Sequence, residues 1–92
     1  MYYYVYMLKA INLGIKKTYV GYTNNVKLRL EKHNNNKGAK STKGYKWLLI
    51  YSKKFKSKSN AMSFEYELKK NKTERKKILE NFYNENLHSI TL

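Results

Sequence analysis

The sequence predicts a small α/β protein of the α+β kind, in which helices flank a three-stranded antiparallel sheet in the order β-β-α-β-α-α. Two segments rich in Tyr and Val, 2–9 and 18–22, have the composition of strands, and a third apolar segment lies at 46–54. The segments that follow the second and third strands carry apolar residues at helical spacing.

The first two strands are expected to form a hairpin. Asn12 and Gly14 are turn residues. A connection centred on Asn12 and Leu13 would bring Tyr6 directly opposite Tyr19 on the adjacent strand. Such aromatic pairs stabilise many sheets, so a structural pair is one interpretation. The other is that two tyrosine hydroxyls on one face of the sheet belong to a functional site.

The first helix is predicted over residues 25–34, with Thr23 or Asn24 as its N-cap. One face of this helix carries two apolar side chains and a histidine, namely Val26, Leu30 and His33. Arg29 lies at the edge of that face and is a surface neighbour of His33, four residues away. The pair belongs either to a site or to ordinary helix chemistry, with an arginine ion pair and a histidine at the helix C-terminus.

The segment 34–45 is expected to be a loop with two glycines. It carries three cations, Lys37, Lys40 and Lys43. A loop of this kind is either a solvated connection or a segment that approaches a phosphate backbone. The following run Trp47-Leu48-Leu49-Ile50-Tyr51 is apolar throughout. It predicts a central strand over 46–54 that is buried on both faces.

The second helix is predicted to begin at Ser57 or Ser59. Its apolar stripe consists of Ala61, Phe64 and Leu68. Glu65 falls between Ala61 and Met62 on the helical wheel, within this stripe. A carboxylate inside an apolar stripe costs free energy unless a partner offsets its charge. A buried ion pair and a metal ion are equally good partners by this argument.

The third helix is predicted over residues 74–83 with Thr73 as its N-cap. Three apolar side chains should face inwards, namely Ile78, Leu79 and Phe82. Residues 84–92 show no clear period and suggest either a frayed tail or an added sheet edge. We expect a single domain over 1–92, with a core of about 2–70 and a C-terminal helix and tail over 73–92.

The composition indicates an anionic partner. Twenty Lys and Arg stand against six Glu, which gives a net charge of +14, and only Arg29 and Arg75 are arginines. Such a charge opposes compaction unless a polyanion such as nucleic acid balances it. The absence of cysteine excludes disulfides and zinc ribbons. Without a long apolar run or a signal-peptide pattern, we expect a soluble, intracellular, cytoplasmic protein with no membrane partner.

Five residues stand in an order and at a spacing that are known from a protein family, namely Tyr6, Tyr19, Arg29, His33 and Glu65. Tyr19-Val20-Gly21 is followed by Arg29 and His33, Tyr4-Val5-Tyr6 lies one strand upstream, and Glu65 lies on the second predicted helix. This arrangement resembles the signature of the GIY-YIG nuclease superfamily, over about residues 2–70. The leading glycine of the signature is replaced here by Tyr4. The chain looks most like the small stand-alone bacterial members.

The resemblance implies a metal-dependent endonuclease that cleaves DNA, or RNA, and a role in DNA repair or recombination. Because the positive charge is mostly Lys and the chain is too short for a separate reading domain, we expect low sequence specificity. Glu65 is the implied metal ligand, for one Mg²⁺ or Mn²⁺ ion, and Arg29 the implied stabiliser of transition-state charge. Tyr6 or Tyr19 is the implied general base, assisted by His33. The loop lysines Lys37, Lys40 and Lys43 are the implied nucleic-acid contacts. Family members often carry an Asn after the glutamate, but the spacing of Asn71 is shorter than expected.

The chemistry of these residue types agrees with phosphodiester cleavage. One carboxylate suits a hard cation whose other ligands are waters and phosphate oxygens, and an arginine can hold two oxygens of one phosphate. Two other classes remain open. One is a non-catalytic basic module that binds DNA or RNA, and the other is a structural or ribosome-associated protein. A carboxylate beside the phosphate site favours the enzyme, because a simple binder has no use for it.

Overall fold

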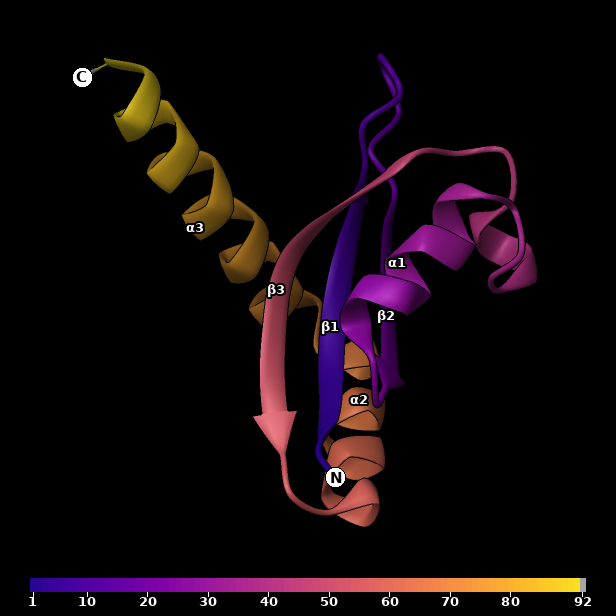
Figure 1. Ribbon diagram of the computed structural model, residues 1–92. Helices are drawn as coiled ribbons and strands as arrows, with labels where there is room; N and C mark the ends of the chain where they lie inside the picture. The colour runs from indigo at the N-terminus through magenta and orange to yellow at the C-terminus, as the bar shows by residue number, and fades with distance from the viewer. Residues whose placement is uncertain (92) are drawn as a thin grey trace.

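The computed structural model describes the backbone of residues 1–91 and the side chains of residues 1–86. The strands are β1 (Tyr3–Ala10), β2 (Thr18–Thr23) and β3 (Trp47–Phe55). The helices are α1 (Val26–Asn34), α2 (Lys58–Lys70) and α3 (Lys72–Thr91), and a 3₁₀ turn, η1 (Lys40–Thr42), precedes β3. The predicted order β-β-α-β-α-α is confirmed. α1 lies in front of the sheet and α2 behind it (Figure 1).

The sheet is antiparallel with the order β2-β1-β3, so β1 is the central strand. The prediction that segment 46–54 is central was wrong, because β3 pairs only with β1, and Leu48 is exposed. The apolar run has another cause. Helices pack on both faces of the sheet, so Trp47 and Leu49 join the cluster on one face while Ile50 and Tyr51 join the cluster on the other. A bulge between the pairs Met7–Tyr51 and Leu8–Leu49 leaves Ile50 unpaired.

The hairpin register differs from the predicted one by two residues of β2. Tyr6 faces Gly21, and Tyr19 faces Leu8. The turn is centred one residue later than expected because Gly14 adopts a φ of 79°, a left-handed conformation that glycine tolerates best. Tyr6 and Tyr19 therefore lie on the same face but on a diagonal, with their ring centroids 6.3 Å apart.

The two faces of the sheet support separate clusters of buried side chains. Val5, Met7 and Val20 pack against α2 and α3, with Ala61, Leu68 and Ile78 as their partners. On the opposite face, Tyr6, Leu8, Ala10 and Trp47 pack against α1 through Val26 and Leu30. The stripes predicted for α1 and α2 are therefore the packed ones, and Ile78 is the member of the α3 stripe that lies in the core. This alternation of inward and outward residues on β1 positions Tyr6 beneath α1.

The caps of the first two helices follow from residues with short polar side chains. Asn25, rather than Thr23 or Asn24, caps α1 by accepting a hydrogen bond from the Leu28 amide at 3.1 Å. Thr23 contributes indirectly, because its hydroxyl accepts a hydrogen bond from the Asn25 amide. At α2 the predicted Ser57 is the cap.

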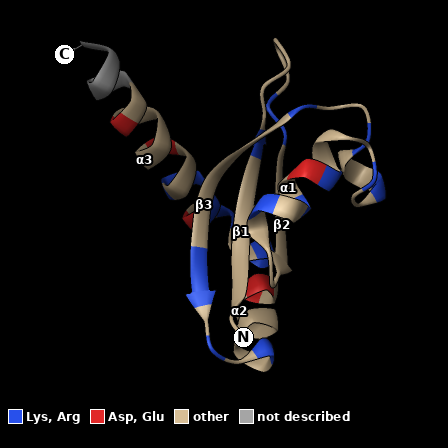
Figure 2. Cartoon of the chain, in the orientation of Figure 1, with Lys and Arg blue, Asp and Glu red and all other residues tan. Residues whose placement is uncertain are grey.

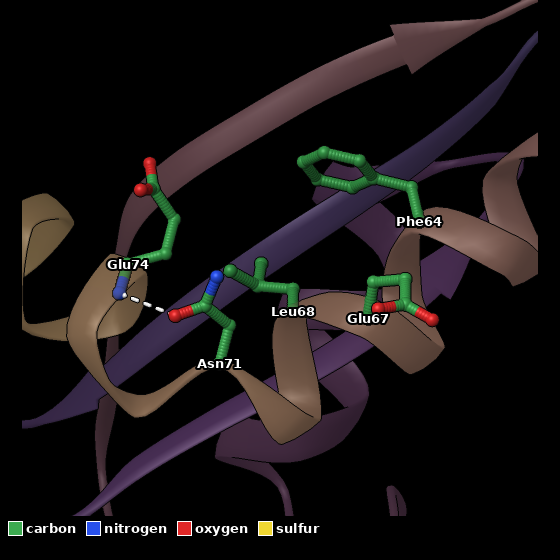
Figure 3. A pocket seen from close by; sticks show the side chains of 5 residues that line it. All are labelled: Phe64, Glu67, Leu68, Asn71 and Glu74. Atoms are coloured by element: carbon green, nitrogen blue, oxygen red, sulfur yellow. Dashed lines mark hydrogen bonds between the residues drawn. The ribbon is translucent and has the colours of Figure 1, made fainter.

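Asn71 joins α2 to α3. Its amide N–H donates to the Leu68 carbonyl, and its side-chain oxygen accepts a hydrogen bond from the Glu74 amide at 3.0 Å (Figure 3). Asn71 rather than Thr73 is thus the N-cap of α3. The Arg75 guanidinium completes the junction by donating to the Leu68 and Lys69 carbonyls. This capping role explains the position of Asn71 close behind α2.

The third helix is longer than predicted. It continues past residue 83 to Thr91, so the described part of segment 84–92 is neither a frayed tail nor a sheet edge. Leu92 lies outside the described residues. Within residues 1–91, the helices are too short or too polar to cross a lipid bilayer.

The caps predict a contrast between two neighbouring side chains. Asn71→Ala should lower the free energy of unfolding by about 1 kcal/mol, because the Glu74 amide loses its acceptor. Thr73→Ala, the matched control two residues away, should change it by much less. Urea unfolding of both variants measures this. Equal destabilisation would contradict the assignment of Asn71 as the cap.

Candidate active site

Three aromatic rings meet on the α1 face of the sheet. Tyr6 comes from β1, Tyr19 from β2 and His33 from the last turn of α1. The His33 ring centroid lies 5.9 Å from that of Tyr6 and 4.9 Å from that of Tyr19. Arg29 lies one helical turn before His33. The tertiary structure thus brings together four of the five catalytic candidates.

His33 is completely buried, and both of its ring nitrogens have partners. Nε2 lies 2.8 Å from the Tyr6 hydroxyl, and Nδ1 lies 2.9 Å from the Thr42 hydroxyl. The Thr42 hydroxyl donates its proton to the Ala39 carbonyl at 2.7 Å, so toward His33 it can only accept. His33 therefore carries its proton on Nδ1, and Nε2 accepts the hydrogen bond from Tyr6.

Two glycines leave room for this network. A Cβ atom on Gly21 would lie 2.5 Å from the Tyr6 hydroxyl oxygen and 3.0 Å from Cε2 of Tyr19. A Cβ atom on Gly38 would overlap the His33 ring at Nδ1. Neither glycine has a positive φ, so the requirement at both positions is space rather than backbone conformation. The Tyr6 ring lies over Gly21, and the loop backbone at Gly38 lies against His33.

The electrostatics of the cluster come from burial and from Arg29. Burial raises the pKa of Tyr6 to about 12, although interaction with the Arg29 guanidinium opposes this rise. Burial also lowers the pKa of His33, and the positive charge of Arg29 lowers it further. The pKa of Arg29 is raised, mainly by its interaction with Tyr6. At neutral pH the buried pair is thus a neutral phenol and a neutral imidazole beside a permanent cation.

The two tyrosines differ in access to solvent. Tyr6 is only 1% exposed, whereas Tyr19 is partly exposed and lines a surface hollow. Arg29 interacts with both hydroxyls. Arg29 is also partly exposed and lines a separate hollow at the start of α1. Tyr19 and Arg29 are therefore both in contact with solvent, whereas Tyr6 and His33 are buried.

Glu65 lies on α2, whose apolar stripe packs on the opposite face of the sheet. Its carboxylate still raises the pKa of Tyr6, as the smallest of the contributions to that shift. The Glu65 side chain is 17% exposed and forms an ion pair at 3.6 Å with Lys69, which is 50% exposed. The buried ion pair that the sequence allowed is therefore not present, since Lys69 is half in solvent.

The donor set fits one kind of metal ion. Among the described residues, no three His, Cys, Asp or Glu side chains lie together. His33 has no nitrogen to offer, because both are hydrogen-bonded. One accessible carboxylate cannot make a zinc or calcium cage, but it suits Mg²⁺, which retains several waters and binds phosphate oxygens.

The glycine-rich loop is a packed element rather than a solvated connection. Thr42 in η1 is buried, and its carbonyl accepts a hydrogen bond from the Trp47 indole at 3.0 Å. The Asn34 side chain anchors the end of α1 to the backbone of Trp47 through two hydrogen bonds. The three predicted contacts of this loop, Lys37, Lys40 and Lys43, are all exposed.

Sequence reasoning missed Thr42 and the reason for the two glycines. Thr42 lies nine residues after His33 in a segment without periodicity, so no pattern connects it to the histidine. The available signal was chemical. A buried imidazole needs a partner at each nitrogen, and Ser41 and Thr42 are hydroxyl residues in the adjoining loop.

Comparison with known proteins gives a consistent match. The model of the GIY-YIG catalytic domain matches residues 2–78. A UPF0213 protein of Staphylococcus haemolyticus is 46% identical over 67 residues, which are 72% of this chain and 78% of that protein. A UPF0213 protein of Oceanobacillus iheyensis is 45% identical over 67 residues, 72% of this chain and 74% of that protein.

One solved structure is also similar to this chain. It is the solution NMR structure of the UPF0213 protein BH0048 from Bacillus halodurans, which is 37% identical in sequence. The alignment covers 88% of this chain and 84% of that chain, with a TM-score of 0.48.

The His33 network makes a prediction about protonation. Because the pKa of His33 is lowered below its ordinary 6.5, folding favours the neutral ring. Its contribution to stability should be complete above pH 6.5 and should be lost as the pH falls through the folded pKa. NMR should show a titration midpoint below 6.5 and a proton on Nδ1. A Thr42→Ser variant should preserve this tautomer, whereas Thr42→Val should not. An Nε2 proton in the wild type would contradict the network.

Proposed function

Because the chain belongs to the GIY-YIG catalytic domain family, we propose that it is a metal-dependent endonuclease that cleaves DNA with little sequence preference. The family supports a nuclease-type function acting on nucleic acid. The observation that carries the finer proposal is the Arg29 guanidinium, which interacts with the accessible Tyr19 and with the Tyr6–His33 pair behind it. A phosphate that enters beside Tyr19 meets a fixed cation with a fork of donors.

The proposed roles divide between exposed and buried groups. Tyr19, as its phenolate, contacts the attacking water and takes its proton to become the neutral phenol, because it is the motif tyrosine within reach of solvent. Arg29 stabilises the phenolate before this transfer and then the negative charge that develops on the phosphate. Tyr6 and His33 are positioning residues. Their hydrogen bond holds the Tyr6 hydroxyl against Arg29 and so limits the orientations of the guanidinium.

Glu65 is the proposed metal ligand, for one Mg²⁺ or Mn²⁺ ion. A bound ion would neutralise phosphate charge and orient the water, while Glu65 would supply the only protein ligand among the described residues. Its ion pair with Lys69 supports this role, because a half-exposed ammonium can leave the carboxylate when a divalent cation arrives. Lys37, Lys40 and Lys43 are proposed as additional phosphate contacts on an exposed loop.

The division of roles predicts opposite outcomes for two tyrosine variants. Tyr19→Phe should lose cleavage by about 10²-fold or more, as for a general base, with little change in stability. Tyr6→Phe should lower the free energy of unfolding by about 1–3 kcal/mol, because the buried Nε2 of His33 loses its donor. Single-turnover cleavage and thermal melts measure both.

The result that would overturn this division is specific. If Tyr19→Phe cleaves at the wild-type rate while a folded Tyr6→Phe does not, then Tyr6 is the reacting tyrosine. If neither variant changes cleavage, the motif tyrosines are structural and the proton acceptor lies elsewhere.

The metal-ligand assignment is tested by Glu65→Gln with Glu67→Gln as its control on the same helix. The Glu65 change should abolish Mg²⁺-dependent cleavage, on the order of 10²-fold or more, and leave DNA binding in EDTA intact. Its effect on stability should stay below about 1 kcal/mol, because a half-exposed ion pair contributes little. Glu67 is exposed and lines the hollow between α2 and α3, and its substitution should alter neither property.

Incubation of plasmid and single-stranded DNA with each variant, with Mg²⁺ or with EDTA, provides the readout. Cleavage by the Glu65 variant at the wild-type rate would remove Glu65 from the metal site. A wild-type protein that binds DNA in both conditions but never cuts it would identify a non-catalytic binding module instead.

A further inference from the structure

A groove runs along the free edge of β2, on the side where α2 and α3 pack. It consists of two adjoining hollows of about 250 and 230 Å³ that share Thr18 and Arg75 in their walls. β2 has a neighbouring strand on one side only, so its outer backbone groups face this edge. We call this feature the β2-edge groove.

The groove is lined by cations that come from three separate parts of the chain. They are Lys16 from the hairpin, Lys69 from the end of α2, and Lys72, Arg75 and Lys76 from the start of α3. Among the residues whose side chains are described, neither hollow has an acidic member in its wall. The hollow between α2 and α3 in Figure 3 differs, because Glu67 and Glu74 line it. The described charged side chains in the walls of the β2-edge groove are therefore all basic, unlike those of the neighbouring hollow between α2 and α3.

One of these cations is held in place. The Arg75 guanidinium donates to the carbonyls of Leu68 and Lys69 at the end of α2, so its position is fixed by the helix junction. The lysines around it are exposed and can adjust to a ligand. Figure 2 shows basic residues on many parts of the chain, so charge alone does not distinguish this region. The region is distinguished by the fixed position of Arg75 and by its concave shape.

The groove is connected to the candidate active site at two points. Tyr19 lines its first hollow. Lys69, in the same hollow, forms the ion pair with Glu65 at 3.6 Å. A strand whose phosphate lay beside Tyr19 and Arg29 could thus continue over the edge of β2 into the groove.

We propose that the β2-edge groove binds the phosphate backbone of the nucleic acid that continues from the cleavage site. This inference rests on the proposed function and specifies where the substrate leaves the site. Lysines make distance-tolerant contacts to phosphates, and the groove offers no aromatic platform for base stacking beyond Tyr19. Its contribution is to affinity rather than to base preference or to the chemical step.

The test compares three triple variants that remove equal charge. The first, in the groove, is Lys16→Gln, Lys72→Gln and Lys76→Gln, which spares Lys69 and Arg75 because they contact Glu65 and α2. The second, at the end of β3 and the loop after it, changes Lys53, Lys54 and Lys56 to Gln. The third changes the loop residues Lys37, Lys40 and Lys43 to Gln. Thermal melts check that each variant is folded.

Binding of fluorescent single-stranded and duplex DNA is measured in EDTA over a range of salt concentrations. The groove variant should bind on the order of tenfold or more weakly. Its salt dependence should also be shallower, by about 0.9 in the log–log slope for each duplex phosphate that the protein no longer neutralises. The β3 variant should change less than half as much. At saturating DNA and Mg²⁺, the single-turnover rate of the groove variant should equal that of the wild type.

Equal losses of affinity in the groove and β3 variants would show that the charge acts diffusely, and would overturn the proposal. A loss confined to the loop variant would place the strand on the η1 side and would also overturn it. The measurement separates this proposal from the nuclease assignment. If the groove variant loses affinity but the protein never cleaves DNA, the groove proposal is supported and the nuclease proposal is contradicted. If the protein cleaves DNA but the groove variant binds as tightly as the wild type, the nuclease proposal is supported and the groove proposal is contradicted.

Discussion

The buried imidazole of His33 is the constraint on which the site depends. An imidazole in the interior is costly unless both nitrogens are satisfied, and here one partner is Tyr6 of the central strand and the other is Thr42 of the loop. These hydrogen bonds tie β1, α1 and η1 to one ring. Burial and the neighbouring Arg29 keep the ring neutral, so it accepts from Tyr6 and donates to Thr42.

Several features of the chain follow from this ring. Gly38 lacks a side chain because the loop backbone lies against the imidazole, and Gly21 lacks one because Tyr6 lies over it. The Thr42 carbonyl then accepts from Trp47, whose backbone is also bound by Asn34 at the end of α1. A segment for which a solvated connection was one of two interpretations is therefore part of the support for α1, which carries Arg29.

Much of the fold and of the site could be predicted, because the relevant signals are local. Helical spacing located the packed stripes of α1 and α2 and the buried Ile78 of α3, and Ser57 was recognised as a cap from its residue type. The errors arose where the outcome depends on which of several residues or strands forms a given interaction. The run 47–51 has the composition of a central strand, yet it forms an edge because β1 pairs on both sides. Thr73 is a good cap by type, but Asn71 reaches the Glu74 amide.

The sequence by itself determined the order of the elements, the excess of positive charge and the identity of the motif residues, since each is encoded over short spans. Only the tertiary structure decided which tyrosine is exposed, what His33 contacts and how Glu65 is paired. It also brought Lys16 beside Lys72 and Lys76 along the edge of β2. These relations join residues far apart in the chain, and they depend on strand order, hairpin register and helix packing. Small differences in packing energy fix all three, and no local pattern records them.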